Sequence, residues 1–258
     1  MVIGLDKFKE YFEAFPDQYV IIGGTACDVV LTDAGFIARA TKDIDIILII
    51  EALNQEFVAQ FWIFIQDGDY ERREESTDER RYYRFTNPAT EGFPKQIELF
   101  ARKPEIIFLP PDAHLIPIPV DDDLSSLSAI LLNDEYYEYI IEHSKVENGL
   151  RMANIESLIV LKAKAFLEIR DRIANGQKED SRHITKHKND VYRLGVMLTE
   201  TDPFNLPPLI KSHMMYFMEE ASKEIPDARF FKDFGAAGVD PKAVHDQLIT
   251  SFKLNVNG

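Results

Sequence analysis

The sequence has few features of a secreted or membrane protein. Cys27 is the only cysteine among 258 residues, so the chain can form no internal disulfide, and a reducing compartment such as the cytoplasm is expected. No apolar run reaches the roughly 18 residues of a membrane-spanning helix. Residues 1–9 have neither a basic start nor a long apolar core, so no signal peptide is expected. We therefore expect a cytoplasmic protein with no membrane partner.

Common catalytic signatures are also missing. The chain contains no Walker P-loop and no Gly-x-Gly-x-x-Gly dinucleotide motif. His183 and His187 are one helical turn apart, but the His-Glu-x-x-His arrangement of many zinc enzymes is absent. A zinc hydrolase is therefore not expected.

Positive charge is scarce overall and gathers in one region. The formal net charge is −15, which argues against broad nonspecific binding of nucleic acid, because such binding depends on cations that release counterions from phosphates. Residues 151–200 are the exception, with ten Lys and Arg against seven Asp and Glu. This basic region fits a nucleoside triphosphate or one end of an RNA, and it fits a solvated helical surface equally well.

The hydrophobic pattern predicts an α/β domain over residues 1–153. Apolar residues make up 45% of the chain, which is enough for a sizeable core. Apolar residues at steps of three and four predict helices over 5–15 and 52–66. Short apolar runs predict strands over 19–22, 44–50, 80–86 and 95–102. The second of these strands is apolar on both faces after its start, as expected for a central strand.

The last part of this domain is harder to assign. Residues 104–120 hold five of the 13 prolines and are expected to be extended. Residues 131–133, 136–141 and 150–152 are short apolar runs that favour strands and connections.

Helices dominate the second expected domain, residues 154–258. Asn154 can cap a helix over 155–175 that is apolar nearly all round and is therefore expected to be largely buried. Further helices are predicted over 184–198, 206–223 and 239–252. A sheet domain followed by a helical domain is the expected architecture.

A glycine turn and an acidic strand end form the first candidate site. Gly23 and Gly24 follow the first predicted strand and remove side chains where the chain turns into a helix, so backbone N–H groups can approach a phosphate. Thr25 is expected to cap that helix. Asp43 and Asp45 open the next strand and, being two residues apart, project from the same face.

Two neighbouring carboxylates repel each other unless a cation lies between them. Oxygen ligands at this spacing suit Mg²⁺, which binds few carboxylates and keeps positions for water and phosphate. A phosphate-binding turn beside a metal-binding strand is the arrangement that phosphoryl or nucleotidyl transfer requires.

These residues resemble a known family. Gly23-Gly24, then Asp43-Ile-Asp45, then an acidic residue on a later strand is similar to the nucleotidyltransferase superfamily typified by DNA polymerase beta. The longer string, with Arg39-Ala-Thr-Lys leading into the acidic pair, looks most like the abortive-infection (AbiEii-type) toxin nucleotidyltransferases.

The resemblance implies a fold and a set of roles. The fold would be α/β (α+β), with a nucleotidyltransferase-like mixed sheet in the N-terminal lobe and a helical C-terminal lobe that closes the cleft. The third metal-binding carboxylate would be Glu98, at a position where aspartate is commoner. Mg²⁺ or Mn²⁺ would then be bound by the catalytic residues Asp43, Asp45 and Glu98. The nucleoside triphosphate would be held by the glycine turn, which consists of Gly23, Gly24 and Thr25.

In the second domain the resemblance points to two positions. Lys162 lies within an apolar helix, where it either reaches solvent or projects into a cleft to bind phosphate. Lys186 and Asp190 either belong to the family's Lys-x-x-x-Asp motif or form an ordinary i,i+4 helix pair. Lys162 and Asp190 are therefore candidate nucleotide-binding residues. Arg39, from the string that leads into the acidic pair, is a third candidate.

The expected function is Mg²⁺-dependent transfer of a nucleoside monophosphate from an NTP to an acceptor hydroxyl. By family analogy the acceptor would be the end of a tRNA, and the protein would be the toxin of a toxin–antitoxin pair with an antitoxin partner. Two alternatives remain open. One is a small-molecule nucleotidyltransferase of the aminoglycoside type, whose cationic acceptors an acidic cleft would favour. The other is a protein that keeps the fold without catalysis, as a binding or regulatory module.

Overall fold

The computed structural model describes residues 3–39, 41–71, 83–100, 133–178, 180–199 and 203–254. The chain divides into two compact units. The first unit comprises Met1–Asp28, Ala40–Asp121 and Leu131–Asn154, and the second comprises Val29–Arg39, Asp122–Ile130 and Ile155–Gly258. The predicted extended segment 104–120 lies outside the described residues.

A mixed sheet forms the centre of the first unit. Its strands are β1 (Tyr19–Ile22), β2 (Asp43–Leu48), β3 (Tyr83–Thr86), β4 (Gln96–Phe100), β5 (Ser144–Glu147) and β6 (Leu150–Ala153). Their order in the sheet is β3-β4-β2-β1-β6-β5. β2 runs parallel to β4 and antiparallel to β1, and β1 runs parallel to β6. The expected mixed α+β class is confirmed. The predicted strand before the glycine turn and the predicted strand of the acidic pair are present as β1 and β2.

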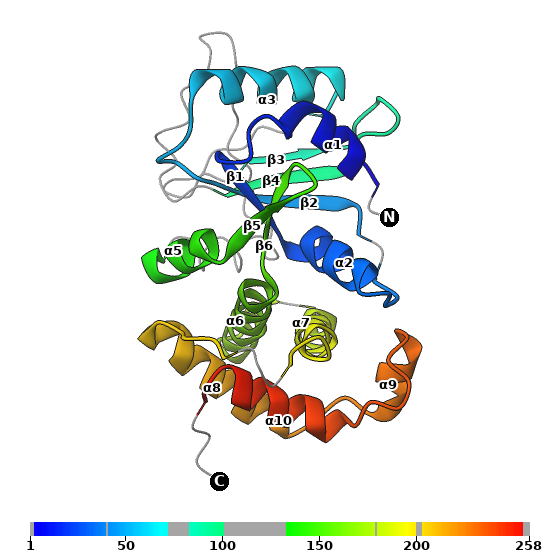
Figure 1. Ribbon diagram of the computed structural model, residues 1–258, viewed down its shortest axis with the longest axis vertical. Coiled ribbons are helices and arrows are strands. Elements are labelled where there is room, and N and C mark those ends of the chain that lie inside the picture. The colour runs from blue at the N-terminus through cyan, green and yellow to red at the C-terminus, as the bar shows by residue number, and fades with distance from the viewer. Residues whose placement is uncertain are drawn as a thin grey trace. The chain divides into compact units, whose positions relative to one another are not determined.

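Aromatic side chains fill one face of this sheet. α1 (Leu5–Phe12) and α3 (Gln55–Asp67) pack against each other on that face (Figure 1). The ring of Phe12 lies 5.7 Å from that of Phe57 on α3, and Tyr19 of β1 stacks against Phe57 at 6.3 Å. Trp62 packs edge-on against Phe85 of β3 at 6.1 Å, so the sole tryptophan is a core residue.

The segment between β4 and β5 departs from expectation. Residues 136–141 were expected to favour a strand, but they lie in the helix α5 (Asp134–Glu142). Asn133 caps this helix, because its Oδ1 accepts from the backbone N–H groups of Glu135 and Tyr136. The hydroxyl of Tyr137 lies 2.9 Å from Glu51 Oε2 and 3.3 Å from the carbonyl oxygen of Leu48, which ties α5 to the end of β2.

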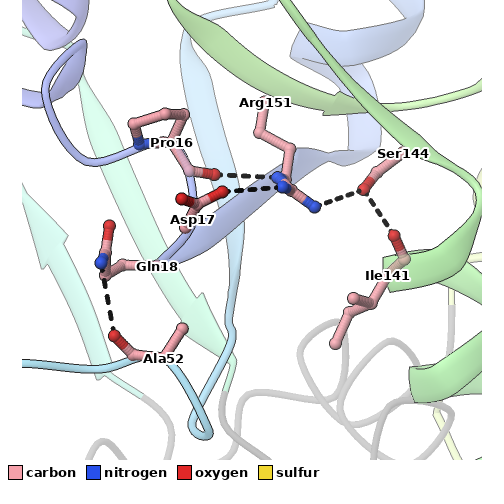
Figure 2. A network of polar contacts seen from close by, with 7 residues as sticks. All are labelled: Pro16, Asp17, Gln18, Ala52, Ile141, Ser144 and Arg151. Carbon is pink, nitrogen blue, oxygen red and sulfur yellow. Dashed lines mark hydrogen bonds and ion pairs between the residues drawn. The ribbon is translucent and has the colours of Figure 1, made fainter.

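An arginine on β6 fastens this late part of the first unit to its beginning. Arg151 Nε donates to the carbonyl of Pro16 at 2.8 Å, and its Nη2 pairs with Asp17 at 3.0 Å. Its Nη1 lies 3.5 Å from Ser144 Oγ, whose own proton goes to the carbonyl of Ile141 (Figure 2). The turn that leads into β1 is thus held by strands that follow much later in the chain.

Helices make up the described part of the second unit after residue 154. They are α6 (Ile155–Ala174), α7 (Ser181–Gly195), α8 (Pro208–Ser222), α9 (Ala228–Asp233) and α10 (Pro241–Ser251). α6 is buried on nearly every side and packs against α7 and α8, and α10 packs against α7 and α8. The short α9 was not predicted. No helix in the described ranges is long and apolar enough to cross a membrane.

α2 (Gly23–Asp33) begins directly at the end of β1. Gly23 has φ +69°, a left-handed conformation that glycine adopts at no steric cost. The helix ends just before Gly35, which has φ +81° and donates its N–H to the carbonyl of Thr32 at 2.9 Å. β1 therefore passes into a helix through a single glycine.

Candidate active site

The register of three strands brings an acidic pair and an arginine together on one face of the sheet. Asp45 of β2 is the direct partner of Glu98 on β4, and Glu98 is the direct partner of Arg84 on β3. Direct partners on neighbouring strands point to the same side. The opposite side carries the aromatic core under α1 and α3, so the row Arg84–Glu98–Asp45 lies on the other face.

Glu98 is held by several donors. Arg84 Nε donates to Oε1 of Glu98 at 2.8 Å, and Arg84 Nη2 lies 2.8 Å from the same oxygen. Gln96 Nε2 donates to that oxygen as well, at 2.6 Å. Gln96 and Glu98 are two residues apart on β4 and therefore share a face. A buried carboxylate with three donor contacts on one oxygen has a fixed orientation.

Asp45 and Glu98 influence each other directly. Burial raises the pKa of Glu98 well above its usual range, and the negative charge of Asp45 and a hydrogen bond with Asp45 raise it further. The Arg84 guanidinium acts in the opposite direction. Two carboxyl groups in contact share either a proton or a cation, because both cannot stay ionised at short range without one. Their oxygen donors and the pairing of their charges fit a divalent cation such as Mg²⁺.

The glycine turn borders the same carboxylate. A Cβ placed on Gly23 would lie 1.8 Å from Oδ2 of Asp45, well inside contact distance. A Cβ on Gly24 would lie 3.0 Å from Thr41 Oγ1. Glycine at 23 is therefore required both by the backbone conformation and by the position of the Asp45 carboxylate. The turn and the acidic strand meet as the sequence predicted.

Thr25 lies at the site but does not cap the helix. The prediction of an N-cap was wrong, because α2 already begins at Gly23 and Thr25 is a buried residue in its first turn. The Thr25 hydroxyl donates to the carbonyl of Asp43 at 2.5 Å. This bond crosses from the helix to β2 and fixes the start of the acidic strand against the glycine turn.

Asp43 lies on the same face of β2 as Asp45. Its register partner on β4 is Gln96, whereas the partner of Asp45 is Glu98. In the part of the chain that the structure describes, no three His, Cys, Asp or Glu side chains are grouped closely enough to hold a metal ion. The closest grouping of predicted ligands is thus the pair Asp45–Glu98, with Asp43 one step further along β2.

The other three candidates lie in the second unit. Lys162 Nζ on α6 is 3.3 Å from Asp190 Oδ2 on α7, and both side chains are buried. Arg193 Nη1 pairs with Asp190 Oδ1 at 3.0 Å. Burial by itself would raise the pKa of Asp190, but Lys162, Arg39 and Arg193 outweigh it and hold this pKa below its usual value. Asp190 thus has tertiary partners beyond any helix pair with Lys186.

This cluster carries more positive than negative charge. Arg193 also lies over the ring of Phe230, 5.0 Å from its centroid. His187, one turn before Asp190, has a buried Nδ1 that makes no hydrogen bond to any described residue. Burial lowers the pKa of His187 well below its usual value, and the Lys162 ammonium contributes. The imidazole is therefore neutral at pH 7.

The predicted residues thus fall into two groups, one in each unit. The first unit brings together the glycine turn, Thr25 and the acidic residues, and the second brings together Arg39, Lys162 and Asp190. Arg84 and His187 were not singled out as site residues. Arg84 could have been found from its place in a strand next to that of Glu98, because a hairpin centred on residue 91 makes 84 and 98 partners. His187 carried no comparable signal.

Comparison with known proteins adds no assignment, since no protein-family model and no curated protein matches this sequence.

Proposed function

We propose that this protein is a Mg²⁺-dependent nucleotidyltransferase that moves a nucleoside monophosphate from an NTP to an acceptor hydroxyl. The observation that carries the proposal is the position of Asp45, which is paired in register with Glu98 on one side and lies against Gly23 on the other. A cation held by the pair would lie beside a turn that offers backbone N–H groups to a phosphate.

Each candidate residue of the first unit has a role in this proposal. Asp45 and Glu98 would hold the cation, and Asp43 would complete its surroundings together with phosphate and water oxygens. Mg²⁺, when bound, neutralises triphosphate charge and polarises the phosphoryl group that is transferred. Gly23 and Gly24 keep the approach to the turn free of side chains, and Thr25 holds β2 in place through the Asp43 carbonyl.

The finer fold assignment belongs to this proposal too. The first unit would be a nucleotidyltransferase-like lobe, and the helical second unit would contribute Arg39, Lys162 and Asp190 to nucleotide binding. The excess of positive charge around Asp190 supports an anionic ligand there. By the family resemblance the acceptor would be a tRNA end, the protein a cytoplasmic toxin and its partner an antitoxin; a small-molecule acceptor is the other possibility.

Nucleotide binding tests the proposal. Calorimetric titrations with ATP, GTP, CTP and UTP, each with and without Mg²⁺, would compare the wild type with Asp45→Asn and with the control Asp17→Asn, a carboxylate of the same unit that pairs with Arg151. We expect Mg²⁺-dependent binding of at least one nucleotide, lost in Asp45→Asn and kept in Asp17→Asn. Binding that survives in Asp45→Asn, or no binding by the wild type, would refute the proposal.

Transfer itself needs a second assay. The nucleotide that binds would be supplied with a labelled α-phosphate, together with either total tRNA or an aminoglycoside. Label that moves to RNA identifies the tRNA class of acceptor, and label that moves to the small molecule identifies the other. A wild type that binds nucleotide with Mg²⁺ but labels neither would favour the non-catalytic alternative.

A further inference from the structure

Two side chains clamp a single oxygen of Glu98. Nε and Nη2 of Arg84 and Nε2 of Gln96 all lie within 2.8 Å of Oε1. Both residues come from fixed places in the sheet, because Arg84 is the cross-strand partner of Glu98 and Gln96 precedes it by two residues on β4. The side chains of Arg84 and Glu98 are only 18% and 11% exposed, so water competes little for these contacts.

The clamp matters because Glu98 is a glutamate. A glutamate side chain has one more rotatable bond than an aspartate side chain, so its carboxylate is less well placed by the backbone alone. Charge-assisted bonds from a guanidinium restrict such a carboxylate strongly. With Oε1 occupied by three donor contacts, the carboxyl group still meets Asp45 through a hydrogen bond. The contacts of Glu98 are thus divided between a clamped oxygen and the neighbouring carboxylate.

We infer that Arg84 and Gln96 are positioning residues, which orient Glu98 so that its remaining carboxylate oxygen and Asp45 together bind a divalent cation. The inference rests on the proposed function, because it concerns the cation that this carboxylate pair would hold. Partners that orient a metal ligand without touching the metal commonly change metal affinity by roughly tenfold to hundredfold when they are removed.

An alternative role for Arg84 predicts the opposite sign. If Arg84 were only an internal counterion of Glu98, it would compete with a divalent cation for the same carboxylate. Removing it would then leave the cation affinity unchanged or make it stronger. A positioning role predicts that removal makes the affinity weaker, so the direction of the change separates the two roles.

The test is the affinity of the full-length protein for Mn²⁺ alone, measured by calorimetry at one fixed pH. The variants are Arg84→Met, which removes the clamp, Arg84→Lys, which restores a cation with a single donor group, and Gln96→Leu. The matched control is Arg151→Met, which removes another arginine of the same sheet with contacts to Pro16 and Asp17 (Figure 2). Far-UV circular dichroism and thermal unfolding without metal would accompany each titration.

We expect Arg84→Met to bind Mn²⁺ roughly tenfold to hundredfold more weakly than the wild type. Arg84→Lys should lie between them, Gln96→Leu should weaken binding, and Arg151→Met should bind like the wild type. Unchanged or tighter binding by Arg84→Met, beside clear binding by the wild type, would overturn the inference and leave the proposed function intact. If Arg84→Met does not fold, the Arg84→Lys and Gln96→Leu affinities decide in the same way. A wild type that binds no Mn²⁺ and no nucleotide would overturn the proposed function and this inference together.

Discussion

At the scale of single residues, Gly23 has two separate reasons to be glycine. Its φ of +69° is unfavourable for other residues, and a Cβ would overlap Oδ2 of Asp45. Gly92 of the same unit offers a matched comparison, because its φ is +87° but a Cβ there would meet nothing within 4 Å. The difference between the stability losses caused by alanine at the two positions therefore reflects the contact with Asp45.

We therefore expect Gly23→Ala to destabilise the first unit more than Gly92→Ala does. Gly92→Ala should cost about 1 kcal/mol, from the backbone alone, and Gly23→Ala about 3 kcal/mol, because the Asp45 carboxylate must also move. Urea unfolding followed by fluorescence measures this directly, since the sole tryptophan, Trp62, is in the core of that unit. Equal losses at the two positions would show that the Asp45 contact is unimportant.

The pair Lys162–Asp190 is a second feature at residue scale. Removing one partner of a buried ion pair leaves an uncompensated charge, which typically costs about 3–5 kcal/mol. We expect Asp190→Leu to approach this cost, because it leaves Lys162 and Arg193 without their shared carboxylate. Lys162→Met should cost less, because Arg193 still faces Asp190.

A double-mutant cycle checks this expectation. The variant carrying both changes should be more stable than the sum of the two single losses predicts, since it removes both charges. Urea unfolding followed by far-UV circular dichroism reports mainly on the second unit, because the longest helices, α6, α7 and α8, lie there. Asp233→Asn, which alters the exposed pair with Arg229, is the control and should leave the midpoint unchanged. Additive losses in the cycle would mean that the two side chains do not interact energetically.

At the scale of elements, α7 makes the second unit sensitive to pH. The folded state holds His187 neutral, whereas an unfolded chain takes up a proton near pH 6.5. Because the unfolded state binds more protons below that pH, stability falls as the pH is lowered through 6.5. Lys162, Lys186 and His183 oppose protonation in the folded state, and Asp190 favours it.

We expect the wild type to lose on the order of 1 kcal/mol more than His187→Gln between pH 7.5 and pH 5.5. The comparison uses the difference between the two proteins, so that other titrating groups cancel. Urea unfolding followed by circular dichroism at both pH values gives this difference. Parallel losses in the two proteins would show that His187 is already able to take up a proton in the folded state.

The elements also show how far local sequence patterns carry. Short apolar runs identified β1, β2 and β4, and the spacing of Asp43 and Asp45 gave their shared face, because strand geometry depends on local alternation. The same reasoning assigned 136–141 as a strand, since Tyr and Ile favour strands in general. In the structure these residues form a helix, which the Asn133 cap and the hydrogen bonds of Tyr137 stabilise. A tertiary hydrogen bond of this kind leaves no local pattern in the sequence. Thr25 failed as a cap for a similar reason, because its hydroxyl serves the Asp43 carbonyl instead.

At the scale of the whole molecule, the hydrophobic pattern predicted a protein of mixed helices and strands, and the α+β class is confirmed. The grouping of Val29–Arg39 with the helical second unit could not be predicted, because it depends on contacts between segments far apart in the chain, such as the bond from Ile37 N–H to the Phe234 carbonyl. The pairing of Asp190 with Lys162 depends in the same way on how α6 packs against α7. The partners of a side chain thus depend on tertiary packing, which a local sequence pattern does not encode.

The order of strands in the sheet has a consequence for synthesis. β1 leaves the ribosome before every other strand of the sheet, but its neighbour β6 follows only after β2, β3 and β4. Until then Tyr19–Ile22 is an apolar strand with one unpaired edge, and such edges recruit other chains. A nascent chain halted before Leu150 would therefore be prone to aggregate, and the polar contacts of Arg151 would close the sheet as one of the last steps of assembling this unit.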